Sequence, residues 1–168
     1  MIAEDLGLLS DDVVDFIKKT GLPGMKIFQF AFDGTPSQYL PHNYDINCVA
    51  YTGTHDNNTL LGWLYDANEG ARNFALKYCG FSGSGWGAGG PQCGSTKAII
   101  KTIIASSAKL AIIPLQDLLG YGGDTRMNVP GVAEGNWEFR VAYEALMGLD
   151  RTYFADVNAT YGRTSGDL

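Results

Sequence analysis

Two short segments place carboxylates directly after apolar runs. Residues 48–51 form one such run, and His55 and Asp56 follow it closely; residues 1–3 form another, which Glu4 follows. Polar side chains at the C-terminal end of a buried strand are typical of the catalytic face of an α/β barrel. Two strand ends that each deliver a carboxylate predict acid/base chemistry on a polar substrate.

Each of these residues also has a structural explanation. Glu4 is also consistent with a residue that solvates a loop, and Asp56 with the N-cap of a helix that we predict to begin near Asn57. A single histidine such as His55 is more often structural than functional. Spacing alone therefore leaves both interpretations open for Glu4 and Asp56.

The composition limits the classes of partner. The 168 residues carry a formal net charge of −6 and a sequence pI of about 4.7. These values argue against binding to nucleic acid or to an anionic membrane surface, because both require basic patches. Hydrophobic residues make up 45% of the chain, which is enough to form a core.

The sequence shows no sign of a membrane or secreted location. No apolar run approaches the length of a membrane span, and no N-terminal secretion signal is present. The 3 cysteines include no CxxC pair, so neither a disulfide framework nor a zinc site is predicted. We expect a cytoplasmic protein, or one of the plastid stroma if the source is a plant or alga, with no cofactor and no metal.

Strand and helix patterns alternate along the chain. Apolar runs predict the end of one strand at residues 1–3 and further strands at 25–30, 48–51 and 110–114. Helices are predicted between Ser10 and Gly21, near 57–63, and at 69–78, 95–107 and 137–147. We interpret residues 80–94 as a glycine-rich loop and expect 151–168 to be a poorly defined polar tail.

This order of elements predicts a parallel sheet. Strands that are apolar throughout and alternate with helices indicate an α/β fold with both faces of the sheet covered. The loops that follow the strands are long and polar, as on the catalytic face of a barrel. Four strands cannot close a barrel. We therefore predict that residues 1–168 form a partial catalytic domain, the C-terminal half (strands 5–8) of a (β/α)8 TIM barrel.

A series of short motifs resembles one known family. The motifs are IAEDLG (2–7), PGM (23–25), QFAF (29–32), LPHN (40–43), YTGTHDN (51–57), PLQDLLG (114–120), RMNVPG (126–131) and GNW (135–137). In this order, over residues 1 to about 150, they resemble the C-terminal part of the 4-α-glucanotransferases. These enzymes, also called amylomaltases or disproportionating enzymes, form glycoside hydrolase family 77 of the α-amylase clan.

The resemblance implies a retaining transglycosylase. Such an enzyme cuts an α-1,4-glucan, holds the glycosyl group on an aspartate and passes it to the 4-hydroxyl of another glucan. It implies that Glu4 is the acid/base, that Asp56 stabilises the transition state, and that the nucleophile lies upstream of Met1. The implied partners are α-1,4-glucans and maltooligosaccharides, a glucose or maltodextrin acceptor, and the missing N-terminal half of the barrel.

The same resemblance suggests residues that bind the substrate. His55 would donate a hydrogen bond to the sugar that Asp56 holds, and Asn57 would bind substrate or only cap a helix. Phe30 would pack on a glucose ring or in the core, and Asp33 would bind hydroxyls or turn the chain. Asn128 would reach the substrate. A calcium site that uses Asn128 lacks EF-hand spacing and is not expected.

Two other functions stay open. Without its nucleophile, the chain is alternatively a non-catalytic glucan- or partner-binding remnant of the same fold. Glu4 and Asp56 would also suit an inverting glycosidase, whose carboxyl groups lie about 6.5–9.5 Å apart. We expect residues 1–168 alone to lack transferase activity. We also expect open sheet edges to promote self-association or binding of the missing half.

Overall fold

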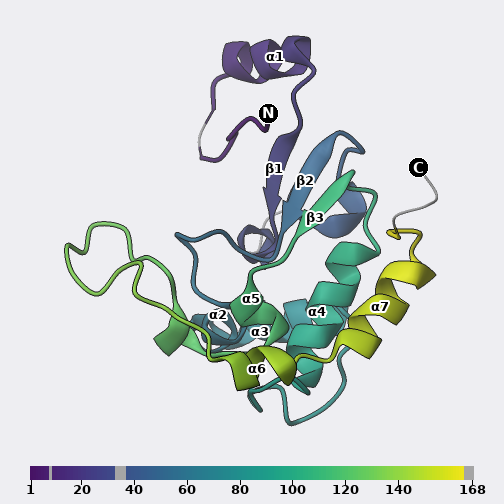
Figure 1. Ribbon diagram of the computed structural model, residues 1–168. Coiled ribbons are helices and arrows are strands. Elements are labelled where there is room, and N and C mark those ends of the chain that lie inside the picture. The colour runs from purple at the N-terminus through teal and green to yellow at the C-terminus, as the bar shows by residue number, and fades with distance from the viewer. Residues whose placement is uncertain (8, 33–36, 165–168) are drawn as a thin grey trace.

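The computed structural model describes residues 1–7, 9–32 and 37–164. Within these residues a parallel sheet of order β1-β2-β3 lies beside a group of helices (Figure 1). The strands are β1 (Gly24–Ile27), β2 (Cys48–Tyr51) and β3 (Leu110–Ile112). The α-helices are α1 (Asp11–Thr20), α2 (Leu60–Asp66), α3 (Glu69–Tyr78), α4 (Gly94–Ile104), α5 (Leu115–Leu118), α6 (Tyr143–Met147) and α7 (Arg151–Thr160). Three short 3-10 helices are η1 (Phe28–Phe32), η2 (Pro41–Asn43) and η3 (Gly123–Thr125).

The register of the sheet aligns the carboxyl ends of its strands. Ile27 of β1 pairs with Tyr51 of β2, and Tyr51 pairs with Ile112 of β3. Because the strands are parallel, η1, the loop 52–59 and α5 all begin at the same edge of the sheet. Ligands of open parallel sheets bind outside this edge, so any site is expected there.

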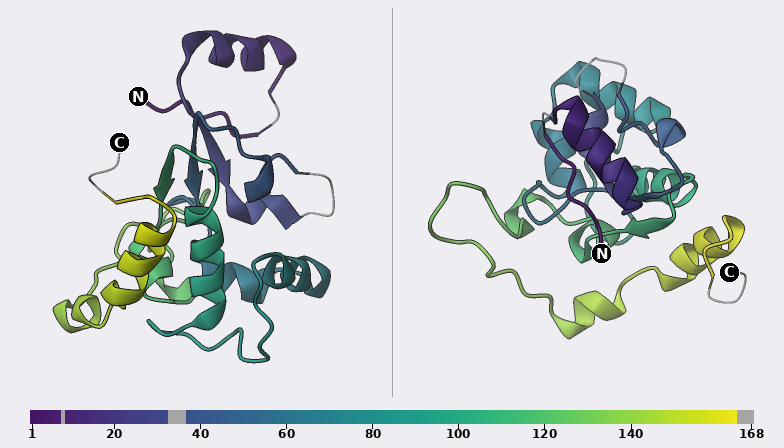
Figure 2. Two further views of the ribbon diagram at one scale, coloured as in Figure 1. Left: turned by 90° about the vertical axis from the view of Figure 1, so that its right-hand side faces the viewer. Right: turned by 90° about the horizontal axis from the view of Figure 1, so that it is seen from above.

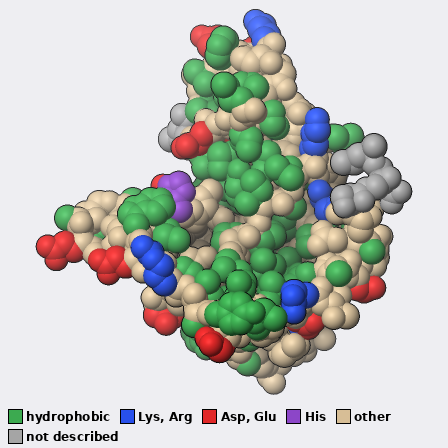
Figure 3. All heavy atoms as spheres, viewed as in Figure 1, with side chains coloured by type: hydrophobic (Ala, Val, Ile, Leu, Met, Phe, Trp, Pro, Cys, Tyr) green, Lys and Arg blue, Asp and Glu red, His purple; other side chains and the backbone are tan. Residues whose placement is uncertain are grey.

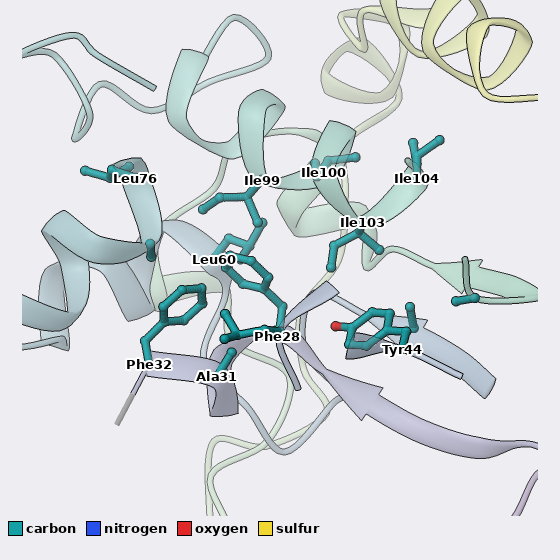
Figure 4. Packing of buried hydrophobic residues seen from close by; sticks show 14 of the residues in the cluster. Phe28, Ala31, Phe32, Tyr44, Leu60, Leu76, Ile99, Ile100, Ile103 and Ile104 are labelled. Atoms are coloured by element: carbon teal, nitrogen blue, oxygen red, sulfur yellow. The ribbon is translucent and has the colours of Figure 1, made fainter. Parts of the chain in front are cut away.

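The core lies between β2, η1 and the helices α2, α3, α4 and α7 (Figure 4). Phe28 is fully buried, and its ring centroid lies 4.7 Å from that of Phe32. Leu60 of α2 and Ile99 and Ile103 of α4 are also fully buried around it. Burying one such side chain contributes about 1.5–3 kcal/mol. This packing fixes α2, which follows the loop 52–59, and η1, which contacts that loop through Gln29.

The N-terminal half differs from prediction at three places. Residues 1–3 are not a strand; one backbone hydrogen bond, from Ala3 N to Pro23 O at 2.9 Å, joins them to the chain before β1. The strand predicted over 25–30 ends at Ile27, because Phe28, Ala31 and Phe32 bury one side of a 3-10 helix. The helix predicted near 57 begins at Leu60 instead.

The C-terminal part contains two further corrections. The helix predicted over 137–147 spans only Tyr143–Met147, because Trp137 has a φ of 65° that a right-handed helix excludes. The tail expected over 151–168 is largely α7, whose Phe154 and Val157 are buried in the core. Apolar packing therefore orders a segment whose overall polarity suggested a tail.

Two features of the outer surface bear on the site. The segment 126–140, called the arm below, lacks regular secondary structure and projects away from the helices (Figures 1 and 2). Strands β1 and β3 each pair on one side only in the described residues, and Leu110 and Ile112 of β3 are 46% and 40% exposed. None of the helices described is long and apolar enough to cross a membrane.

Candidate active site

The loop after β2 is a tight turn. The side-chain carbonyl oxygen of Asn57 accepts hydrogen bonds from the Thr54 amide at 2.8 Å and the Thr54 hydroxyl at 2.9 Å. Asn57 N donates in return to Thr54 O at 3.2 Å. His55 and Asp56 occupy the tip of this turn, and both are exposed. The turn therefore directs these two polar side chains outward from the end of β2.

Close packing from η1 supports this loop from beneath. The Gln29 side-chain amide donates to Asn58 O at 2.7 Å. A Cβ at Gly53 would lie 2.7 Å from the same amide nitrogen, so only glycine leaves room for this contact. Thr59 then caps α2, accepting from Gly62 N at 3.1 Å. The alternative in which Asp56 caps the helix is therefore wrong.

Asp117 of α5 joins both ends of the loop. It is 1% exposed; one carboxylate oxygen accepts from the Thr52 hydroxyl at 2.5 Å and the other from Leu60 N at 2.7 Å. Burial raises the pKa of Asp117 to about 6, although the hydrogen bonds from Thr52 and Leu60 oppose the rise. The spacing between Thr52 and Leu60, and hence the position of the turn, depends on this carboxylate.

The arm holds Asp56 from the other side. Asn128 donates a side-chain hydrogen bond to Asp56 Oδ1 at 2.6 Å, and Arg126 Nη2 donates to the Asp56 carbonyl at 2.5 Å. His55 Nε2 lies 3.4 Å from the same Oδ1. Asn128, which we expected to reach the substrate, therefore contacts a predicted catalytic carboxylate directly.

The N-terminal segment lies beside the first residues of β1. Asp5 Oδ1 accepts from Met25 N in β1 at 2.6 Å, and a Cβ at Gly24 would collide with that carboxylate. Asp5 therefore anchors the N-terminal segment to the backbone of β1. Its neighbour Glu4 is left exposed above the sheet.

One open pocket of about 550 Å³ brings most of the predicted residues together. It is lined by Glu4, Leu6, Met25, Phe30, Tyr51, Gly53, Thr54, His55, Asp56, Asn57, Ile112 and Pro114. Figure 3 shows this face hollowed between the strands and the arm, with hydrophobic side chains gathered in the hollow. Its size suits a small ligand such as one or two sugar rings. Carboxylates beside apolar and aromatic walls suit a ligand with both hydroxyls and apolar faces.

Three other predicted residues need comment. Phe30 lines the pocket from η1 rather than from a strand end, is 39% exposed and packs edge-on against Tyr39 at 5.5 Å. Asn57 also lines the pocket, but its side-chain oxygen already accepts hydrogen bonds from Thr54 within the turn. Asp33 lies outside the described residues.

Sequence reasoning missed three residues that shape the site. Asp117 lies in the PLQDLLG motif, but the sequence indicates no role for it because its partners Thr52 and Leu60 are 65 and 57 positions away. Arg126 donates to the backbone carbonyl of Asp56, and a contact with a backbone atom does not depend on the type of the partner residue. Trp137 packs its ring on His55, with centroids 5.1 Å apart. The RMNVPG and GNW motifs contained Arg126 and Trp137, but spacing alone gave no contact for either.

Known proteins resemble this chain closely. The family model of the 4-alpha-glucanotransferases matches residues 1–145. The chloroplastic/amyloplastic 4-alpha-glucanotransferase of Arabidopsis thaliana is 41% identical over 167 residues, which cover 97% of this chain and 28% of that protein. The Thermus thermophilus 4-alpha-glucanotransferase is 41% identical over 145 residues, 84% of this chain and 28% of that protein.

A solved structure agrees with these relatives. Amylomaltase from Streptococcus agalactiae, in complex with acarbose, matches with a TM-score of 0.88 at 33% identity, over 98% of this chain and 32% of that one. The prediction of a partial (β/α)8 barrel is confirmed by this match. The chain spans about 28% to 32% of the length of these relatives. Since the family model covers most of its residues, the chain belongs to the 4-alpha-glucanotransferase family.

Proposed function

We propose that this chain supplies the acid/base and the transition-state carboxylate of a 4-α-glucanotransferase that moves α-1,4-glucan segments between maltodextrins. The observation that carries the proposal is that Glu4 and Asp56, 52 positions apart in the sequence, line one open pocket that includes Tyr51 and Ile112, the last residues of β2 and β3. Membership of the family supports the choice of reaction. The acarbose bound to the Streptococcus agalactiae amylomaltase supports a carbohydrate ligand.

Glu4 acts in two steps in this proposal. It first donates its proton to the glycosidic oxygen that leaves, which allows the bond to the anomeric carbon to break. The carboxylate then accepts the proton of the acceptor 4-hydroxyl, which becomes the new glycosidic oxygen. A transferase results when an acceptor glucan reaches the glycosyl-enzyme before water does.

Asp56 binds the hydroxyls of the sugar ring and stabilises its oxocarbenium-like transition state. Its contacts with Asn128 and His55 support this role, since they hold one carboxylate oxygen in place. His55 and Asn128 extend the same hydrogen-bonding group toward the sugar. Phe30 offers an apolar surface, and Asn57 and Asp33 are further proposed contacts.

The proposed reaction needs a third carboxylate. A retaining mechanism requires a nucleophile about 5–5.5 Å from the acid/base group. In the described part of the chain, Glu4 and Asp56 are the carboxylates that line the pocket. We therefore propose that the nucleophilic aspartate, and the strands that cover the exposed Leu110 and Ile112, belong to the N-terminal part of a longer enzyme. Residues 1–168 would be one partial catalytic domain of it.

The source of the protein decides its compartment. We propose the cytoplasm, or the plastid stroma in a plant or alga. The chloroplastic/amyloplastic name of the Arabidopsis thaliana relative supports the second location.

The test is a reconstructed enzyme. Residues 1–168 are joined to the preceding part of the Streptococcus agalactiae amylomaltase and incubated with maltotriose. We expect glucose and longer dextrins, and a rate at least about 100-fold lower after Glu4→Gln. Glu69→Gln, on the surface of α3, is the matched control and should retain the full rate. Hydrolysis without longer products, or unchanged transfer in Glu4→Gln, would refute the proposal.

A further inference from the structure

An exposed tryptophan lies at the rim of the pocket. Trp137 is 55% exposed, and its ring centroid is 5.1 Å from that of His55, with the planes tilted by 37°. It lines a smaller pocket of about 190 Å³ that shares Thr54, His55 and Asn57 with the larger one. One part of the indole therefore contacts the proposed catalytic loop, while more than half of the residue faces solvent.

The backbone at Trp137 is strained in a way that fixes the indole. Its φ is 65°, in a region that bulky residues rarely adopt. Among the described residues, Trp137 is the only one other than glycine with a positive φ. Two hydrogen bonds hold it there: Trp137 N donates to Met127 O at 2.7 Å, and Arg140 donates to Trp137 O at 3.2 Å. Strain of this kind persists only where surrounding contacts enforce it, and it concentrates at functional sites.

The base of the arm contacts both Asp56 and its neighbour His55. Arg126 and Asn128 hold Asp56 from the outgoing part of the arm, and Trp137 contacts His55 from the returning part. The bond from Trp137 to Met127 closes the arm between them. The arm thus places a large aromatic surface beside the residues that would bind the reacting sugar.

We propose that Trp137 is a stacking subsite for a glucosyl unit of an α-1,4-glucan, adjacent to the unit held by Asp56. A pyranose ring has an apolar face of C–H groups, and an indole offers the largest apolar aromatic surface among side chains. Stacking the sugar face on the indole removes both apolar surfaces from water, and this gain requires no hydrogen bond between them. This inference rests on the proposed function, because the ligand is the glucan of the same site.

The test is a direct binding measurement with the 168-residue chain. Intrinsic tryptophan fluorescence is followed as maltoheptaose is added, and affinity is measured in parallel by calorimetry. We expect a saturable change in emission that the difference between wild type and Trp137→Ala assigns to Trp137. Affinity should fall about tenfold in Trp137→Ala and less in Trp137→Phe, which keeps an aromatic face. Trp86→Phe, in the loop before α4, is the control and should bind as the wild type does.

Two results would overturn the inference. One is the lack of a saturable maltoheptaose signal from the wild-type chain; the other is equal affinity of the wild type and Trp137→Ala. A purely packing role for Trp137 would leave its emission unchanged by the sugar. The maltotriose transfer assay of the reconstructed enzyme reports separately on the proposed function, so failure of one is distinguishable from failure of the other.

Discussion

Asp117→Asn should change how the stability of this chain depends on pH. The buried carboxyl has a pKa of about 6 in the folded chain, against an ordinary value of 3.8. At about 1.4 kcal/mol per pKa unit, the difference corresponds to about 3 kcal/mol. Because the folded pKa is raised, this free energy opposes folding when Asp117 is charged in both states. The contribution disappears as the pH falls below the ordinary value.

The variant isolates this contribution because asparagine has the same shape and does not titrate. The free energy of unfolding of the wild type, minus that of Asp117→Asn, should fall by about 2 kcal/mol between about pH 4.5 and about pH 7.5. Urea unfolding followed by circular dichroism at several pH values measures it. A difference that stays constant within about 0.5 kcal/mol, or that rises with pH, would refute the reasoning.

A second substitution checks the cause of the effect. The Thr52 hydroxyl donates to Asp117 at 2.5 Å and favours the charged carboxylate. Thr52→Val removes this donor, so the pKa of Asp117 should rise further and the pH dependence should extend to higher pH. If Thr52→Val leaves the pH dependence where it was, the hydrogen bond does not affect the titration of Asp117.

Two matched pairs of variants test the backbone. Gly21 and Gly120 have φ of 69° and 61°, but a Cβ meets nothing at Gly21 and collides with the Gly90 carbonyl at Gly120. Urea unfolding should show a loss of about 1 kcal/mol for Gly21→Ala and about 2–4 kcal/mol for Gly120→Ala; equal losses would contradict the collision. Thr59 caps α2 and Ser10 makes no side-chain cap bond to α1. Thr59→Ala should therefore cost about 1 kcal/mol and Ser10→Ala clearly less in the same assay.

Local signals account for the elements that sequence reasoning predicted well. The apolar run 48–51 is β2, and the helix predicted over 69–78 is α3 with the same bounds. The limits of β2 and α3 coincide with changes in residue type along the chain. Asn68, for example, caps α3 by accepting from Ala71 N at 2.9 Å. Such boundaries are set by neighbours along the chain and can be recognised without the fold.

The errors arose where distant contacts decide the conformation. Phe28, Ala31 and Phe32 are all buried, and their spacing does not follow the every-second-residue pattern of a strand. A short apolar run is nevertheless compatible with either a strand or a helix until the elements that bury it are known. The same limit applies to the site. The place of Asp56 after a strand made it a candidate site residue, but its contact with Asn128 spans 72 positions. Hydrogen bonds over such distances have no local pattern that predicts them.

The buried Asp117 shows why this site is less stable than its packing allows. A carboxylate offers an acceptor on each oxygen, and here the two acceptors hold Thr52 and Leu60 at the two ends of the turn that carries Asp56. An apolar residue would avoid the desolvation of a charge but would leave the Leu60 amide, which no other helix residue can accept from, without a partner. Asp117 therefore fixes the turn with a group whose charged form destabilises the folded chain at neutral pH. Stability and the placement of the proposed transition-state carboxylate are opposed at this one position.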